Sequence, residues 1–93
     1  MPVKKLLLDL IQKNSTMVFS KSYCPFCNTA KKALSQHKYD FKALELDLEP
    51  NGDKIQAQLQ ALTGQTTVPN IFINQKHIGG CDALLKKLSL ENV

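Results

Sequence analysis

The fold is decided by Thr16-Met17-Val18-Phe19-Ser20 and by Cys24-Pro25-Phe26-Cys27, which begins after three intervening residues. The first stretch is short and mostly apolar, which predicts a buried strand. After the second stretch, residues recur at the spacing of one helix face, namely Phe26, Ala30, Ala33, Leu34 and His37. The chain is therefore expected to turn from a strand into a helix at the two cysteines.

Two thiols two residues apart at such a corner point to one activated sulfur. The N-terminus of a helix presents unpaired N–H groups and a partial positive charge, and both stabilise a thiolate at Cys24. Pro25 suits the first helical position because it lacks the N–H that would go unpaired there. Cys27, one turn further in, can attack a mixed disulfide formed on Cys24. The corner therefore predicts thiol–disulfide exchange.

Length and composition favour a single folded domain over residues 1–93. The chain is 43% hydrophobic and 22% charged, which is typical of globular proteins. Its three cysteines are too few and too unevenly spaced for a secreted disulfide scaffold. No apolar run approaches the length of a membrane span, and residues 1–14 predict an amphipathic first helix, not a signal peptide. We expect a cytoplasmic location, although a removed targeting segment would also fit this sequence.

The charge pattern argues against nucleic acid as a partner. The net charge is +4, but all 12 basic residues are lysines spread along the chain, with no aromatic residues interleaved among them. A mildly positive surface near the thiols, from Lys21 above all, favours small anionic substrates.

The remaining segments alternate between helix and strand. We expect helices at 3–13 and 25–38, with a half-buried strand at 41–48 whose inward residues are Leu44, Leu46 and Leu48. A third helix follows Asn51-Gly52-Asp53, with Ile55, Leu59 and Leu62 facing the core, and it closes at Thr63-Gly64.

The C-terminal third predicts a hairpin and a last helix. Residues 71–73 and 76–78 are strands joined by the turn Asn74-Gln75, and the final helix turns Leu84, Leu85 and Leu88 inward. This order predicts an α/β fold, with a four-stranded mixed sheet flanked by helices on both faces.

Four segments together carry a resemblance to a known family. They are Lys21–Cys27, Ile55-Gln56, Thr63–Pro69 and Ile78–Asp82. A CxxC motif alone is a weak signal, but CPFC followed by Thr67-Val68-Pro69 and then by Ile78-Gly79-Gly80 is strong. In order and spacing, over essentially the whole chain, the sequence resembles the dithiol glutaredoxins, which have a thioredoxin-like fold.

The resemblance implies a glutathione-disulfide oxidoreductase. Such an enzyme reduces glutathione mixed disulfides through Cys24 alone and protein disulfides through a redox-active Cys24–Cys27 pair. It implies glutathione as co-substrate with no tightly bound cofactor and no metal. The implied partners are glutathione, glutathionylated or disulfide-bonded proteins and, indirectly, glutathione reductase, with the chain acting as a monomer without nucleic acid or membrane.

Carried over position by position, the resemblance also implies a glutathione groove. Its residues would be Lys21, Tyr23, Gln56, Thr67, Val68, Pro69, Cys81 and Asp82. Lys21 and Gln56 would meet the glycine carboxylate, while the Val68 backbone, before a cis Pro69, would pair with the cysteinyl part. Cys81 and Asp82 would hold the γ-glutamyl end, and Tyr23 and Phe26 would wall the sulfur. Many family members carry an acidic residue where this chain has Ala83, which puts the strength of glutathione binding in question.

Other interpretations remain open at this stage. The CPFC motif could be half of a zinc site completed by Cys81, His77 or His37. Cys24 could instead hold an iron–sulfur cluster shared between two chains. A thioredoxin-like reductant is a further alternative, although the chain has no tryptophan. Cys81 is expected to be a small buried residue without a redox role, the alternative being an exposed thiol, and both histidines are expected to be structural.

Overall fold

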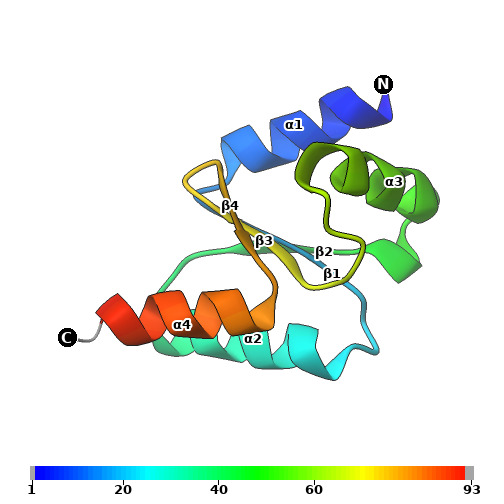
Figure 1. Ribbon diagram of the computed structural model, residues 1–93. Coiled ribbons are helices and arrows are strands. Elements are labelled where there is room, and N and C mark those ends of the chain that lie inside the picture. Colours follow the sequence, from blue (N-terminus) through cyan, green and yellow to red (C-terminus); the bar gives the residue numbers. More distant parts are fainter. Residues whose placement is uncertain (1, 92–93) are drawn as a thin grey trace.

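Two helical layers enclose one mixed β-sheet in the computed structural model, which describes residues 2–91 (Figure 1). The elements are α1 (Val3–Lys13), β1 (Thr16–Ser20), α2 (Pro25–Gln36), β2 (Lys42–Glu45), the 3₁₀ helix η1 (Leu46–Leu48), α3 (Gly52–Thr63), β3 (Asn70–Ile73), β4 (Lys76–Gly79) and α4 (Cys81–Glu91). The predicted fold class is confirmed. None of the helices between residues 2 and 91 has the length and apolar character needed to cross a bilayer.

The sheet has the strand order β2-β1-β3-β4, so β1 lies inside it. β1 pairs with β2 in parallel and with β3 in antiparallel orientation, and β3 forms an antiparallel hairpin with β4. The parallel pair is joined by α2, as a βαβ unit requires. The CPFC corner therefore lies at the carboxyl end of an interior strand.

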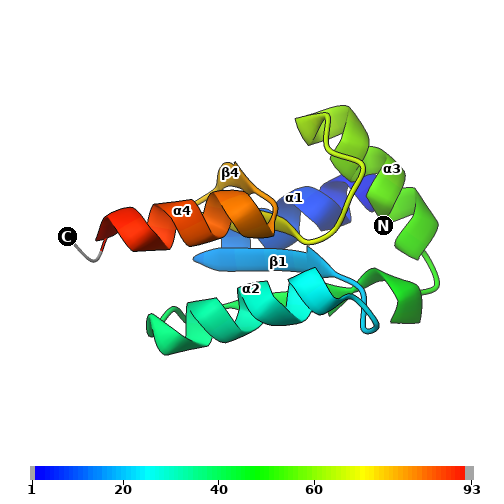
Figure 2. The same ribbon diagram turned by 60° about the horizontal axis from the view of Figure 1, so that its bottom comes forward.

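The two faces of β1 feed two separate cores. α1 and α3 pack together on one face of the sheet, and α2 and α4 on the other (Figure 1 and Figure 2). Val18 points into the core under α2 and α4, whereas Met17 and Phe19 point into the core under α1 and α3. Because both faces are covered, every residue of β1 is buried, which explains its nearly continuous apolar sequence.

The predicted strand at 41–48 was too long. It ends at Glu45 and continues as η1, so Leu46 is buried but Leu48 is 70% exposed. The first turn of α3 explains the change of direction, because a Cβ placed on Gly52 would lie 1.9 Å from the Leu46 carbonyl oxygen. The chain folds back so tightly here that only glycine fits, and a straight strand cannot continue.

Three smaller expectations also needed correction. Leu62 and Leu85 are 49% and 39% exposed, so neither is a buried core residue. α2 ends at Gln36, and Lys38 takes a left-handed backbone with φ 63°.

The predicted Asn74-Gln75 turn is confirmed, with φ of 51° and 67°, the positive values that two-residue hairpin turns need.

Candidate functional site

Cys24 is the N-cap residue of α2. Its sulfur accepts a hydrogen bond from the Cys27 backbone N–H at 3.2 Å, so it meets one of the unpaired donors of the first turn. Pro25 occupies the start of the helix, as predicted. The Cys24 side chain is partly exposed, whereas Cys27 is fully buried, and both thiols are free. The two sulfurs are therefore unequal in access to solvent.

Burial raises the pKa of the Cys27 thiol to about 11, and its hydrogen bond with Cys24 adds to the rise. The Lys21 backbone and the Ser20 hydroxyl act in the opposite direction. At neutral pH the Cys27 thiol is therefore protonated. Cys27 is a protonated, enclosed thiol, which suits the second sulfur of a dithiol pair and not the attacking one.

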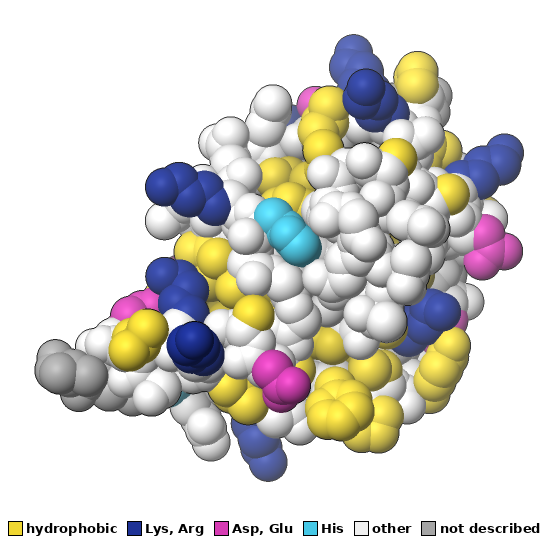
Figure 3. Space-filling model, viewed as in Figure 1, with side chains coloured by type: hydrophobic (Ala, Val, Ile, Leu, Met, Phe, Trp, Pro, Cys, Tyr) yellow, Lys and Arg dark blue, Asp and Glu magenta, His cyan; other side chains and the backbone are white. Residues whose placement is uncertain are grey.

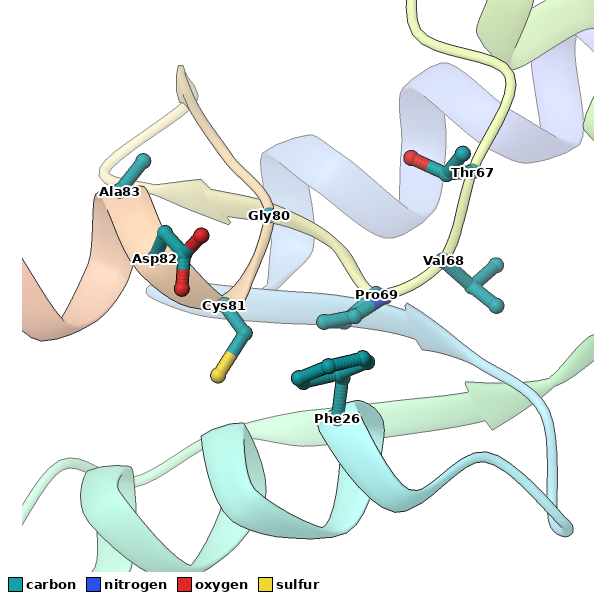
Figure 4. Close-up of a pocket in the computed structure, with 8 residues that line it drawn as sticks. All are labelled: Phe26, Thr67, Val68, Pro69, Gly80, Cys81, Asp82 and Ala83. Atoms are coloured by element: carbon teal, nitrogen blue, oxygen red, sulfur yellow. The ribbon is translucent and has the colours of Figure 1, made fainter.

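A groove of about 500 Å³ opens beside the dithiol (Figure 4). It is lined by Phe26, Thr67, Val68, Pro69, Gly80, Cys81, Asp82 and Ala83. These residues come from the start of α2, the loop before β3 and the start of α4. The Val68 carbonyl oxygen lies 3.9 Å from the Cys24 sulfur, and the Val68–Pro69 peptide is cis, as predicted.

Gln65 fixes the loop that forms one wall of this groove. Its side-chain Nε2 donates to the Thr67 carbonyl at 3.0 Å and to the Pro69 carbonyl at 2.8 Å, and so brackets Val68. Gln65 is half-buried, and its role comes from these two hydrogen bonds. The sequence contains little indication of this role. Gln65 is an amide close to Thr67 and Pro69, whose carbonyl groups do not pair with another strand.

Three of the predicted ligand residues lie outside the groove lining. Tyr23 is 69% exposed. Lys21 is partly buried in the loop before α2, and its charge helps to lower the pKa of Asp47. Gln56 donates from Nε2 to the Thr66 carbonyl at 2.6 Å, while its buried Oε1 has no hydrogen-bond partner among residues 2–91.

Asp47 is exposed, and its carboxylate holds the loop before α2 in place. It accepts hydrogen bonds from the Ser22 N–H at 2.9 Å and from the Ser22 hydroxyl. These bonds are the main reason why the pKa of Asp47 is lowered. Through Asp47, η1 therefore fixes the position of the loop between Lys21 and Cys24.

Cys81 lies at the start of α4 and is buried, as expected. Burial raises the pKa of its thiol, and the charges of Asp82 and Cys24 raise it further. In Figure 4 its side chain projects from the α4 start toward α2, where Phe26 lies.

Neither histidine lies in the groove. His77 Nε2 is 2.9 Å from Asn70 Oδ1 on the hairpin, and burial lowers its pKa. His37 caps the C-terminus of α2. Between residues 2 and 91, no three His, Cys, Asp or Glu side chains are grouped so that they could hold a metal ion.

Charge is dispersed over the visible face of the molecule. In Figure 3 the lysine side chains are distributed over several parts of the visible face, some of them in adjoining pairs, and do not form one basic patch.

A helix-start dithiol of unequal burial, beside a loop-walled groove on a mixed four-stranded sheet, defines a thioredoxin-like thiol oxidoreductase. The family model described as Glutaredoxin matches residues 16–78. The chain belongs to the glutaredoxin family, whose members are thiol oxidoreductases with a glutathione-linked redox function.

Relatives and solved structures agree with this assignment. A glutaredoxin of Ricinus communis is 51% identical over 81 residues, covering 87% of this chain and 79% of the relative. Glutaredoxin-C6 of Oryza sativa subsp. japonica is 58% identical over 77 residues, covering 83% and 69%. The holo form of glutaredoxin C1 from Populus tremula x tremuloides superposes with a TM-score of 0.91 at 40% identity, covering 95% of this chain and 87% of that one. A buckwheat glutaredoxin–glutathione complex gives a TM-score of 0.89 at 44% identity, covering 96% and 84%.

Proposed function

We propose that this protein reduces glutathione mixed disulfides through Cys24 alone and protein disulfides through Cys24 and Cys27 together. The observation that carries the proposal is the asymmetry of the pair. Cys24 is partly exposed at a helix start beside a groove, and Cys27 is buried one turn inside. A two-stage thiol exchange needs an accessible sulfur that attacks the substrate first and an enclosed sulfur that attacks the resulting mixed disulfide.

In the monothiol route, the Cys24 thiolate attacks the glutathione sulfur of a mixed disulfide. A new Cys24–glutathione disulfide forms, the original disulfide breaks, and the substrate thiolate leaves and takes a proton from solvent. A second glutathione, as thiolate, then attacks the adduct, so Cys24 returns as a thiolate and oxidised glutathione departs. The helix N-terminus stabilises the Cys24 anion at the start and at the end of this cycle.

In the dithiol route, Cys24 first attacks a protein disulfide and becomes linked to the target. Cys27 then attacks the Cys24 sulfur, which forms the intramolecular disulfide and releases the reduced target. Two glutathiones reduce the Cys24–Cys27 bond, and glutathione reductase recycles the oxidised glutathione. The enclosed position of Cys27 keeps its thiol available for this internal attack.

The groove is proposed to hold glutathione. A glutathione complex is known for the buckwheat relative, which supports glutathione as the ligand. Thr67, Val68 and Pro69 would line the cysteinyl part, and Cys81 and Asp82 at the start of α4 would meet the γ-glutamyl end.

The glycine carboxylate is assigned to the other side of the loop. Lys21 would supply charge, and Gln56 would supply its amide N–H group, which donates to the Thr66 carbonyl in this structure. Tyr23, fully outside the groove lining, would reach the ligand only from the rim. Ala83 leaves Asp82 as the acidic side chain among the groove-lining residues, so we expect the ammonium end to be held less firmly than the sulfur.

The wider setting follows from the same chemistry. We propose one domain acting as a monomer in the cytoplasm, with glutathione as co-substrate and no tightly bound cofactor. A cluster or metal carrier that uses Cys24 is the alternative function. It is not favoured, because the groove and the buried second thiol are features of disulfide exchange.

Turnover of a small glutathione mixed disulfide, coupled to glutathione reductase, tests the proposal. Cys24→Ser should abolish turnover, whereas Cys27→Ser should retain it and lose only the reduction of protein disulfides. The two variants are matched, because each replaces one sulfur by oxygen within the same helical turn. Full activity in Cys24→Ser would contradict the mechanism.

A further inference from the structure

We propose that Tyr23, Phe26 and Leu48, here called the rim patch, form a docking surface for an extended segment of a protein disulfide substrate. This inference rests on the proposed dithiol route and names the substrates that the route favours. They are disulfides with an apolar side chain close in sequence to the attacked cysteine. Leu48 is the informative member of the patch, because it lies outside the groove lining.

The side chains of the rim patch are largely open to solvent. Tyr23, Phe26 and Leu48 are 69%, 66% and 70% exposed, and Pro25 is exposed as well. Figure 3 shows hydrophobic side chains gathered at the lower right of the molecule, over the start of α2. Single exposed apolar residues are ordinary, but several of them around one point of the surface mark an interaction site.

Asp47 brings Leu48 within reach of Tyr23. The Asp47 carboxylate accepts a hydrogen bond from the Ser22 N–H at 2.9 Å, and Tyr23 and Leu48 directly follow these two residues in the chain. Bond lengths along this path place the α-carbons of Tyr23 and Leu48 within about 16 Å of each other. A straight continuation of β2 would have turned Leu48 into the core, but η1 leaves it at the surface beside the loop before α2.

The position of the rim patch around Cys24 decides what covers it. Tyr23 and Phe26 stand on either side of Cys24-Pro25 in the chain, and Phe26 also lines the groove. The patch therefore continues the surface of the groove around the reacting sulfur. A small glutathione disulfide needs only the groove, whereas a protein disulfide also brings its own backbone over the residues around Cys24. The substrate polypeptide is thus the partner that this surface fits.

The residues near the rim patch favour apolar recognition over charge recognition. α2 contains no acidic residue, and the exposed residues that follow in its first turn are the uncharged Asn28 and Thr29. Lys21 is partly buried, and Asp47 is engaged by the loop before α2, which leaves Glu49 as an exposed charge at the edge. Protein interfaces commonly have this composition, with aromatic side chains at the centre and polar groups around them.

The spacing within the patch limits where the apolar side chain of the substrate lies. An extended segment rises about 3.3 Å per residue, so about five residues span the distance between Tyr23 and Leu48. A substrate cysteine joined to Cys24 therefore places residues up to about five positions away near Leu48. Their apolar side chains lose contact with water there, which a small mixed disulfide cannot match.

Two peptide disulfides that differ only in apolarity test this proposal. Each is a dimer of a short peptide linked through its central cysteine, with either leucine or serine on both sides at positions within reach of Leu48. Reduced protein is mixed with each disulfide and the release of peptide thiol is followed. Cys24 attacks one sulfur and the first peptide leaves as a thiol. Cys27 then forms the Cys24–Cys27 disulfide and releases the second, so two thiols reduce one disulfide.

Leu48→Ser is the test variant and Leu90→Ser is its matched control. Leu90 is 66% exposed and lies near the end of α4, whereas the groove is at the start of that helix. Both changes replace an exposed leucine by serine, so they alter the surface hydrophobicity of the protein equally. Thermal melting reports folding, and Leu48→Ala takes the place of Leu48→Ser if the serine variant does not fold.

We expect the wild type to reduce the leucine peptide about tenfold faster than the serine peptide at low substrate concentration, because apolar side chains are buried. Leu48→Ser should lower this preference by at least about threefold, and Leu90→Ser should leave it unchanged. Turnover of the mixed disulfide of glutathione and mercaptoethanol should change by less than about twofold in either variant.

A preference that Leu48→Ser lowers by less than about threefold would overturn the inference, and so would an equal loss in Leu90→Ser. Equal slowing of the small mixed disulfide in Leu48→Ser would also overturn it, because Leu48 would then act through the dithiol itself. Sedimentation from micromolar to millimolar protein tests the other occupant, and a dimer that Leu48→Ser dissociates would assign the patch to a second copy of the chain. If the wild type did not turn over the small mixed disulfide, the proposed function itself would fail.

Discussion

Gln65 offers the sharpest test of how the groove wall is built. Gln65→Ala removes both hydrogen bonds that bracket Val68, the ones to the carbonyls of Thr67 and Pro69 at 3.0 and 2.8 Å. A typical net hydrogen bond contributes about 0.5–1.5 kcal/mol, so the pair should contribute roughly 2 kcal/mol to the free energy of unfolding. In a domain of this size that loss lowers Tm by about 8–16 °C.

The same change should reach substrate binding. Without the Gln65 amide the loop is held less firmly, and a mixed disulfide has to order it on binding. If ordering the loop costs half of the roughly 2 kcal/mol that the two hydrogen bonds contribute, the binding affinity falls by about fivefold. We therefore expect KM for a glutathione mixed disulfide to rise by about three- to tenfold, with a smaller change in kcat.

Thermal melting and steady-state turnover of the purified variant measure both effects. Gln60→Ala is the matched control, since Gln60 is exposed on α3 and its side chain makes no hydrogen bond within residues 2–91. If Gln65→Ala melted with the control and kept the wild-type KM, the loop would owe its shape to something other than this amide, and our account of the groove wall would be wrong.

Three further predictions concern stability and reactivity. Gly52→Ala should lower the free energy of unfolding by about 3 kcal/mol in urea titrations, because the new methyl group would lie 1.9 Å from the Leu46 carbonyl oxygen. Gly64→Ala is the control, and it should lower the free energy of unfolding by about 1 kcal/mol because of its positive φ. An effect of Gly52→Ala no larger than that of the control would contradict this reasoning. Burial lowers the pKa of His77, so the folded protein should lose stability as pH falls from above 6.5 through the folded value; the loss should be smaller in His77→Gln, and equal losses would refute the assignment. Iodoacetamide at about pH 7.5 should leave Cys27 unmodified in the native protein, as judged by peptide mass spectrometry, and its rapid alkylation would be incompatible with a buried thiol of raised pKa.

The elements around the dithiol could be predicted because their signals are local. A continuous apolar run gives a strand covered on both faces, and Cys24-Pro25 marks the helix start at which the structure places it. Gly64 ends α3 with φ 78°, as its place after Thr63 indicated. Each of these signals depends on residues within a few positions of one another, so no tertiary information was needed.

Features that depend on the exact path of the backbone, and not on the residue pattern alone, could not be predicted even where the contacts are short in sequence. The alternation of Leu44, Leu46 and Leu48 suggested one long strand, but the approach of Gly52 to the Leu46 carbonyl turns the chain after Glu45. Gln65 looked like any exposed amide. Its role exists only because the loop before β3 presents two carbonyls on the same side.

The position of β1 inside the sheet separates the two properties that a dithiol catalyst has to combine. β3 lies on one side of β1 and is preceded by the Val68 loop, which lines the groove beside Cys24. β2 lies on the other side and ends at Glu45, whose carboxylate accepts a hydrogen bond from the buried Ser20 hydroxyl at the end of β1. Cys24 caps the start of α2 and is partly exposed, whereas Cys27 lies one turn inside the helix and is buried. We therefore expect substitutions in the Val68 loop to change substrate preference and substitutions that expose Cys27 to change the two-cysteine route, so the balance between the two routes can shift without altering the CPFC motif.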